Sequence, residues 1–181
     1  MKSKVQELRA IPIFRGLSDA EVLEQATCMS EVQVKRGQIL FHIGQDSDSA
    51  YFNVKGELSA FLQTSQQVQE ILKIGRGSVF GELCLVKPGR RALTIRANTD
   101  CRLLRIDRLR FERLRQERSS SAYRVIRNIC VTACDRLRST NEFIEVEVDH
   151  GEHVVPSVGG KISGIAGVKN RFLTLFGGRS R

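Results

Sequence analysis

The chain has 181 residues, enough for one domain with a hydrophobic core and terminal extensions. Apolar residues make up 41% and charged residues 27%, as in an ordinary globular protein, and no apolar run reaches the roughly 20 residues that cross a bilayer. The net charge of +9 is compatible with nucleic acid or an anionic membrane as a partner. A solvated basic surface is the favoured interpretation, because the arginines of 105–118 alternate with acidic residues.

The first 30 residues are predicted to form a helical segment that packs on the rest of the domain. Residues 3–10 and 19–28 have helical patterns, and Ser18 or Asp19 can cap the second helix. Proline and glycine interrupt the apolar linker 11–17, which favours a packed turn. The charged N-terminus is not followed by an apolar segment, so it is not a signal peptide, and we expect a cytoplasmic protein.

Residues 31–106 have the period of β-strands. Val32 and Val34 alternate with polar neighbours, and residues 44–49 have the composition of a loop. Further short strands are predicted at 39–41, 51–54, 58–62, 68–74, 92–97 and 102–106. Many short strands with glycine-marked turns indicate a β-sandwich or a small barrel.

Two helices and a tail are predicted after the strands. Asp107 caps a helix with apolar residues at 109, 111 and 114, and a second helix runs from about Ser120 to Thr140. We assign these helices to a segment 107–143 and the basic, glycine-rich remainder to a tail, 144–181. Apolar residues at three-four spacing in 162–176 are compatible with an amphipathic helix on a membrane or a partner. The favoured interpretation is a flexible tail, or one that docks on its own domain.

The sequence predicts neither a metal site nor an enzyme. Its five cysteines are odd in number and include no Cys-x-x-Cys pair, which fits neither a disulfide framework nor zinc. Cys130 and Cys134 are spaced as a helical pair, and we expect them to pack in a helix core. No histidine stands in a recognisable nucleophile motif, so we predict no catalytic residues, no metal and no cofactor.

A more specific pattern lies in the later strands. Residues 80–86 read Phe-Gly-Glu-Leu-Cys-Leu-Val, and residues 87–97 read Lys-Pro-Gly-Arg-Arg-Ala-Leu-Thr-Ile-Arg-Ala. This stretch resembles the phosphate-binding cassette of cyclic-nucleotide-binding domains, a family that includes catabolite activators, kinase regulatory subunits and gated channels. The resemblance covers about residues 8–143. It implies a β-barrel of the double-stranded β-helix or jelly-roll type (31–106, cassette 80–92), with N-terminal helices (1–30) and two C-terminal helices.

The resemblance assigns a role to each residue of the cassette. Glu82 matches the glutamate that accepts a hydrogen bond from the ribose 2′-hydroxyl, and Arg91 matches the arginine that pairs with the cyclic phosphate. Backbone N–H groups from Gly81 onward and from Ala92 face the ligand. Arg90, beside Arg91, is the alternative phosphate partner. The predicted ligand-binding set is Phe80, Gly81, Glu82, Leu83, Cys84, Arg90, Arg91 and Ala92.

Elementary chemistry agrees with these roles. A cyclic phosphodiester carries a single negative charge, and an arginine with exposed amides is a suitable anion site. A carboxylate beside this arginine would repel the phosphate, but it can accept a hydrogen bond from a sugar hydroxyl. An internal ion pair of Arg91, or a Glu82 that points away from the cavity, would contradict the interpretation.

The family pattern also bears on the base and on signalling. Threonine after the arginine favours cyclic GMP in the family, so Ala92 favours cyclic AMP, with cyclic GMP the alternative; Leu93 departs from the family's small residue. Tyr123, Ile126 and Ile129 are candidates for the lid over the base, and helix packing or a homodimer seam is the alternative role. Occupancy would be relayed through the C-terminal helices to an unidentified protein partner.

Two other interpretations stay open. The chain could be a ligand-free scaffold with the same fold, or a nucleic-acid binder through its basic helices. The predicted tail, 144–181, has fewer than 40 residues, too few for a helix-turn-helix, so no direct DNA binding is expected.

Overall fold

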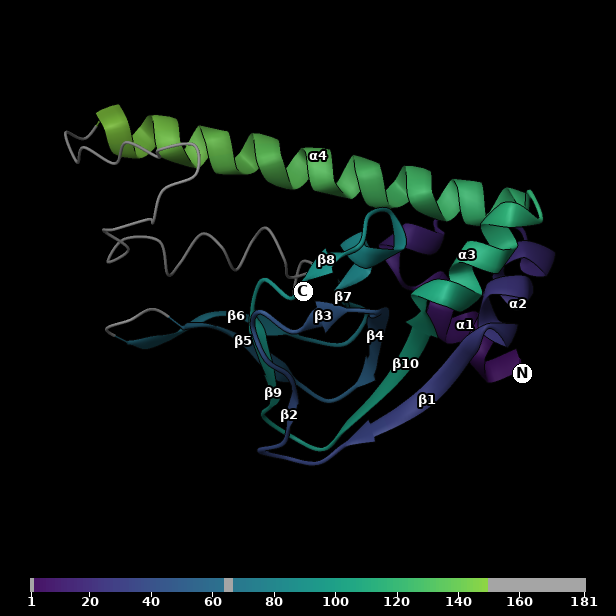
Figure 1. Cartoon of the computed structure of the whole chain (residues 1–181), viewed down its shortest axis with the longest axis horizontal. Helices are drawn as coiled ribbons and strands as arrows, with labels where there is room; N and C mark the ends of the chain where they lie inside the picture. The colour runs from purple at the N-terminus through teal and green to yellow at the C-terminus, as the bar shows by residue number, and fades with distance from the viewer. Residues whose placement is uncertain (1, 64–66, 150–181) are drawn as a thin grey trace.

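The computed structural model describes residues 2–63 and 67–149, and for residues 2–3 and 139–149 it describes the backbone alone (Figure 1). Most of the predicted tail, with its spaced apolar residues, His150 and His153, lies outside the described residues. None of the helices described is long and apolar enough to cross a membrane.

Three short helical elements precede the first strand. They are α1 (Lys2–Arg9), the 3-10 turn η1 (Pro12–Phe14) and α2 (Asp19–Thr27). The hydroxyl of Ser18 accepts a hydrogen bond from the Glu21 N–H, and the Glu21 carboxylate accepts one from the Ser18 N–H. This capping box confirms the predicted start of the second helix and identifies Ser18 as its N-cap.

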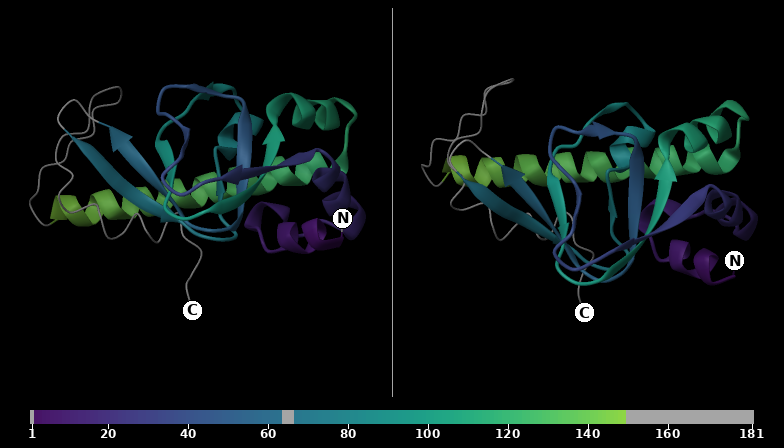
Figure 2. Two further views of the ribbon diagram at one scale, coloured as in Figure 1. Left: turned by 90° about the horizontal axis from the view of Figure 1, so that it is seen from below. Right: turned by 60° about the horizontal axis from the view of Figure 1, so that its bottom comes forward.

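The strands form two antiparallel four-stranded sheets and a small third one. The first sheet has the order β1-β10-β4-β7 and the second β2-β9-β5-β6, while β3 pairs with β8. The described strands do not close into a barrel; they form facing sheets, so the mainly β fold with flanking helices is confirmed and the closed barrel is not found. Figure 2 shows the sheets facing one another, with α4 along one side. The strand bounds are β1 Met29–Val34, β2 Ile39–Phe41, β3 Asp46–Ser47, β4 Ser49–Lys55, β5 Leu58–Gln63, β6 Val68–Ile74, β7 Val79–Phe80, β8 Gly89–Arg90, β9 Thr94–Ala97 and β10 Cys101–Asp107.

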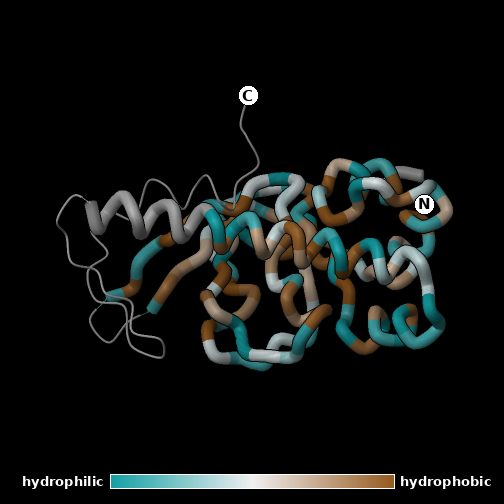
Figure 3. The backbone as a smooth tube through the Cα atoms, turned by 90° about the horizontal axis from the view of Figure 1, so that it is seen from above, coloured by the Kyte–Doolittle hydropathy of each residue, from teal (hydrophilic) through white to brown (hydrophobic). Residues whose placement is uncertain are grey.

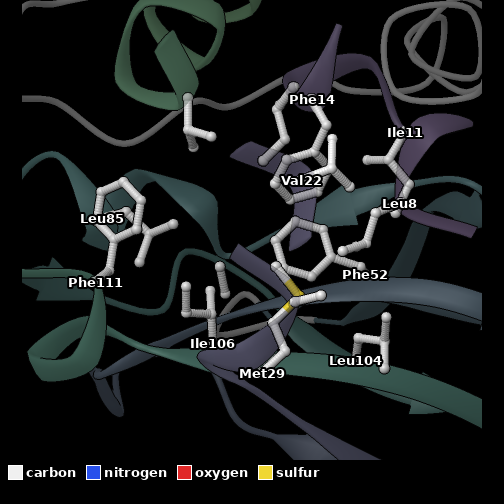
Figure 4. Close-up of a cluster of buried hydrophobic side chains, with 14 of the residues drawn as sticks. Leu8, Ile11, Phe14, Val22, Met29, Phe52, Leu85, Leu104, Ile106 and Phe111 are labelled. Atoms are coloured by element: carbon white, nitrogen blue, oxygen red, sulfur yellow. The ribbon is translucent and has the colours of Figure 1, made fainter. Parts of the chain in front are cut away.

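The strand β4 of the first sheet is buried on both faces. Phe52 on β4 packs into a cluster beneath the helices, where its ring centroid lies 5.2 Å from that of Phe14, as the close-up in Figure 4 shows for the surrounding side chains. Its neighbour Tyr51 points to the other face, into the core between the sheets. Successive side chains of a strand alternate between faces, so both must be apolar when both faces are covered. Residues 49–54 are accordingly all buried, and the buried side-chain amide of Asn53 donates to the carbonyls of Gly56 and Ile74.

Two helices complete the domain, and the second is longer than predicted. They are α3 (Arg108–Gln116) and α4 (Ser120–Asp149). The predicted end near Thr140, and the boundary between residues 143 and 144, fall inside α4. No glycine or proline occurs between residues 120 and 149, so nothing in the sequence breaks the helix there.

The hydropathy and burial of the α4 side chains vary along the length of the helix. Figure 3 shows hydrophobic and hydrophilic segments alternating along this helix. Val125 and Ile129 are buried in the cluster beneath the helices. The expectation that Cys130 and Cys134 pack in a helix core is wrong, because both are exposed. Their spacing places them on the side of the helix that turns away from the domain.

Candidate functional site

A cavity of about 450 Å³ opens between the second sheet, the segment 78–93 and the helix α4. In Figure 1, α4 passes directly over the segment that contains β7, the 3-10 turn η2 (Glu82–Leu85) and β8. Apolar side chains from the strands form its inner wall, among them Phe41, Leu72, Ile74 and Ile95. The size lies within the range of small-molecule sites, roughly 300–1,000 Å³.

The turn into η2 depends on Gly81. Phe80 ends β7 with its ring stacked on Tyr51, at 5.6 Å between centroids, and Gly81 then adopts a left-handed conformation with φ 70°. A β-carbon on Gly81 would overlap Nη1 of Arg91 and lie 3.1 Å from the Ser49 carbonyl oxygen. Glycine is therefore needed here for its backbone conformation and for the close approach of the guanidinium.

Arg91 is buried beside this turn. Its backbone N–H donates to the Gln45 carbonyl at 2.7 Å, and its carbonyl accepts from the Gly44 N–H at 2.8 Å. The guanidinium lies 4.1 Å from the centre of the Phe41 ring. It donates to the Ser49 carbonyl at 2.8 Å and the Ser49 hydroxyl at 3.1 Å, whereas Nε has no hydrogen-bond partner among the described residues.

Arg91 also has one acidic neighbour. Asp48 lies 3.4 Å from Nη2, but its side chain is 69% exposed and it is shared with Arg105 at 3.3 Å. Desolvation by burial acts to raise the pKa of Asp48. The hydrogen bond from Ser49 and the positive charges of Arg105 and Arg91 act in the opposite direction and outweigh desolvation, so the pKa of Asp48 is lowered. The ion pair that would count against phosphate binding is thus present. It is long and solvent-screened, and the shortest bonds of Arg91 go to neutral acceptors.

Glu82 begins the turn η2 and points toward α4. Its side chain is only 5% exposed, and Oε1 accepts a hydrogen bond from Nη1 of Arg136 at 2.6 Å. The partner was not expected: Arg136 comes from α4, 54 residues away in the sequence. A buried carboxylate needs such compensation, since an isolated one is strongly disfavoured.

Cys84 on the same turn is buried as well. Burial raises the pKa of its thiol, so it is protonated near neutral pH and does not behave as a nucleophile. Within the part of the chain that the structure describes, no group of three or more His, Cys, Asp or Glu side chains could hold a metal ion.

Every residue of the predicted ligand-binding set lines this one cavity, Glu82 and Arg91 included. Arg90 is exposed on β8 and reaches the cavity from its rim. The lid candidates do not line it. Ile129 is buried in the helical cluster, Ile126 packs against that cluster, and Tyr123 is 71% exposed.

The part of α4 that lines the cavity lies further along the helix and was missed. It consists of Ala133, Arg136 and Leu137, about one to two turns beyond Ile129, the last residue of the predicted lid. Their three-four spacing places them on one helix face, but the sequence does not say which turn of a long helix lies opposite the cassette. That position follows from the packing of α4 on η1 and α2.

The comparisons with known proteins agree with this geometry. Residues 31–118 match the family model for the cyclic nucleotide-binding domain. The chain is 26% identical over 155 residues to a cGMP-dependent protein kinase of Caenorhabditis briggsae, covering 82% of this chain and 20% of that one. It is 28% identical over 107 residues to a cAMP-dependent protein kinase regulatory subunit of Emericella nidulans, covering 59% of this chain and 26% of that one.

A solved structure is similar over a larger share of both chains. The N-terminal domain of a transcriptional regulator from Streptomyces coelicolor superposes with a TM-score of 0.65 and 28% identity, covering 84% of this chain and 99% of that one. By contrast, the chain spans only 20% and 26% of the two kinase proteins. The similarity to those relatives is therefore confined to a part of each larger protein.

Proposed function

Residues 31–118 belong to the cyclic nucleotide-binding domain family, and from this premise we propose that the cavity beside η2 binds a cyclic nucleotide. The observation that carries the proposal is that Glu82 and Arg91 line the same cavity, with Gly81 in a left-handed conformation against the Arg91 guanidinium. We propose that Arg91 pairs with the cyclic phosphate and that Glu82 accepts the ribose 2′-hydroxyl. The apolar wall of the cavity suits the base.

Arg91 is well placed for such an anion. Its Nε is a buried donor that lacks a partner among the described residues, which is costly in a folded protein unless a ligand takes it up. The bond to Asp48 at 3.4 Å is long enough for a phosphate oxygen to replace it at little cost.

We propose cyclic AMP as the preferred ligand, because Ala92 has no hydroxyl for the guanine amino group. Isothermal titration calorimetry of the chain against cyclic AMP and cyclic GMP tests this directly. We expect one site per chain and an affinity for cyclic AMP several-fold higher. A higher affinity for cyclic GMP would contradict the assignment of the base, and no heat with either ligand would contradict the proposal itself.

The α4 residues that line the cavity are proposed as the lid over the base, in place of the earlier candidates. Leu137→Ala is expected to lower the affinity about three- to tenfold, as burial of a leucine against a ligand contributes roughly 1 kcal/mol. Tyr123→Ala is the matched control, since Tyr123 is on the same helix and comparably exposed, 71% against 65% for Leu137. Equal losses in the two variants would contradict a lid at Leu137.

We propose a regulatory role for the domain, without catalysis, in which occupancy is relayed through α4 to a protein partner. Exposed apolar side chains on α4, Tyr123, Val131 and Leu137, offer a surface for such a partner or for a second copy of the chain. Analytical ultracentrifugation with and without ligand distinguishes the two.

One observation favours the second candidate, a ligand-free scaffold. Both key side chains already have internal partners, Arg91 with Ser49 and Asp48, and Glu82 with Arg136. A scaffold would show no thermal shift with any cyclic nucleotide, whereas a binding domain is stabilised by its ligand.

A further inference from the structure

The partly buried pair of Glu82 and Arg136 joins the cassette to the last helix. Nη1 of Arg136 and Oε1 of Glu82 are 2.6 Å apart, and the side chains of Arg136 and Glu82 are 20% and 5% exposed. Little water reaches the carboxylate of Glu82, so removing Arg136 leaves a buried charge without this partner. Arg136 is therefore part of the cavity wall. It is also the ion-pair partner of Glu82, which is the only buried carboxylate among the described residues that line the cavity.

The charges of the cavity favour an arginine at this position. Among the buried side chains of the cavity wall, Arg91 and Glu82 carry opposite charges, and a cyclic phosphate placed between them would add one negative charge. The exposed Asp48 lies beside Arg91, and Arg136 supplies a positive charge directly at Glu82. The other cations on the cavity wall, Lys87 and Arg90, are exposed at its rim, where solvent screens them.

The geometry allows ligand and ion pair to coexist. The cavity has a volume of about 450 Å³ with the pair formed, so a nucleotide need not break it to enter. The bond from Arg136 occupies Oε1 of Glu82, and a carboxylate has a second oxygen that can accept the sugar hydroxyl.

We propose that Arg136 is a positioning residue of the nucleotide site: its ion pair holds the Glu82 carboxylate oriented toward the ribose, and so couples nucleotide binding to the docked position of α4. This inference rests on the proposed function. Since coupling is reciprocal, the nucleotide must stabilise the docked helix by the same factor by which the docked helix raises affinity.

A double-mutant cycle in the full chain tests the inference. Arg136→Gln is expected to lower the affinity for cyclic AMP about tenfold in the otherwise native chain, and less than about threefold in a Glu82→Gln background, where no charge remains to be compensated. Arg136→Lys, which keeps the charge, should recover most of the loss. Arg138→Gln is the matched control, because Arg138 is 77% exposed and pairs with Asp135 on the outer side of the same helix.

Hydrogen exchange of the α4 backbone provides a measurement that would not respond to the nucleotide through Arg136 if that residue had only a structural role. Cyclic AMP should slow exchange around residues 133–137 in the native chain, and this extra protection should be lost in Arg136→Gln. Thermal unfolding of each variant establishes that it is folded. Equal effects of Arg136→Gln in both backgrounds, or an increase in affinity, would overturn the inference while leaving the proposed function intact. Absence of binding by the native chain would overturn both.

Discussion

Replacing Arg91 by alanine is expected to lower the affinity for cyclic AMP by roughly 10- to 150-fold, the equivalent of about 1.5–3 kcal/mol for charge-assisted hydrogen bonds to a phosphate. The loss is placed at the high end because the guanidinium is buried, with a side chain that is 3% exposed, so water cannot substitute for it. Titration calorimetry at constant ionic strength measures the change.

Arg90→Ala provides the contrast. Arg90 is exposed on β8, so its contribution is screened attraction, and we expect a loss of no more than about threefold. Equal losses in the two variants would refute the choice of phosphate partner. Because Arg91 also bonds to the Ser49 carbonyl, alanine removes a structural contact as well. Arg91→Lys, which retains the charge but not the paired donors, separates the two effects: it should fold like the native chain and still bind weakly.

Replacing Gly81 by alanine is expected to lower the affinity by about tenfold or more and to reduce the free energy of unfolding by roughly 1–2 kcal/mol. The cost to stability arises from the left-handed conformation, φ 70°, which a side chain disfavours. The affinity falls because the new β-carbon would overlap Nη1 of Arg91 and displace the guanidinium from its position beside Ser49. Chemical denaturation and calorimetry measure the two quantities separately.

Gly37→Ala is the control that separates strain from displacement. Gly37 has a similar backbone conformation, φ 83°, but a β-carbon there would meet no atom within 4 Å. Stability should fall by a similar amount in both variants, and affinity should fall only in Gly81→Ala. If both variants bind like the native chain, the close approach of Arg91 to Gly81 does not matter for the ligand.

The residues of the predicted cassette could be singled out in the sequence because the pattern is local. Gly81, Glu82, Arg91 and Ala92 lie within a dozen residues of one another, and a turn that holds them is specified by nearby glycines and by the strands on either side. The mainly β fold was accessible for a similar reason, since strand period and turn residues are properties of short segments. Ser18 with Glu21 likewise marks the start of α2 within four residues.

The contribution of α4 could not be found in this way. Tyr123, Ile126 and Ile129 have the apolar character of a lid, but Ile126 and Ile129 are used against the N-terminal helices instead. Which turn of α4 meets the cassette depends on where the helix is anchored, for example by Asn128, whose amide donates to the carbonyls of Ile13 and Arg15 at 2.9 Å. That anchor joins residues more than 100 positions apart.

The amino-acid sequence by itself therefore indicated the resemblance to the family, the mainly β architecture and the candidate residues Glu82 and Arg91, because these depend on residues close together in the chain. Only the tertiary structure decided which helix face completes the cavity, that the barrel does not close, and that Arg136 compensates the charge of Glu82. The physical reason is that burial and charge compensation are set by distances in space, and a local pattern carries no information on which distant side chain will supply the opposite charge.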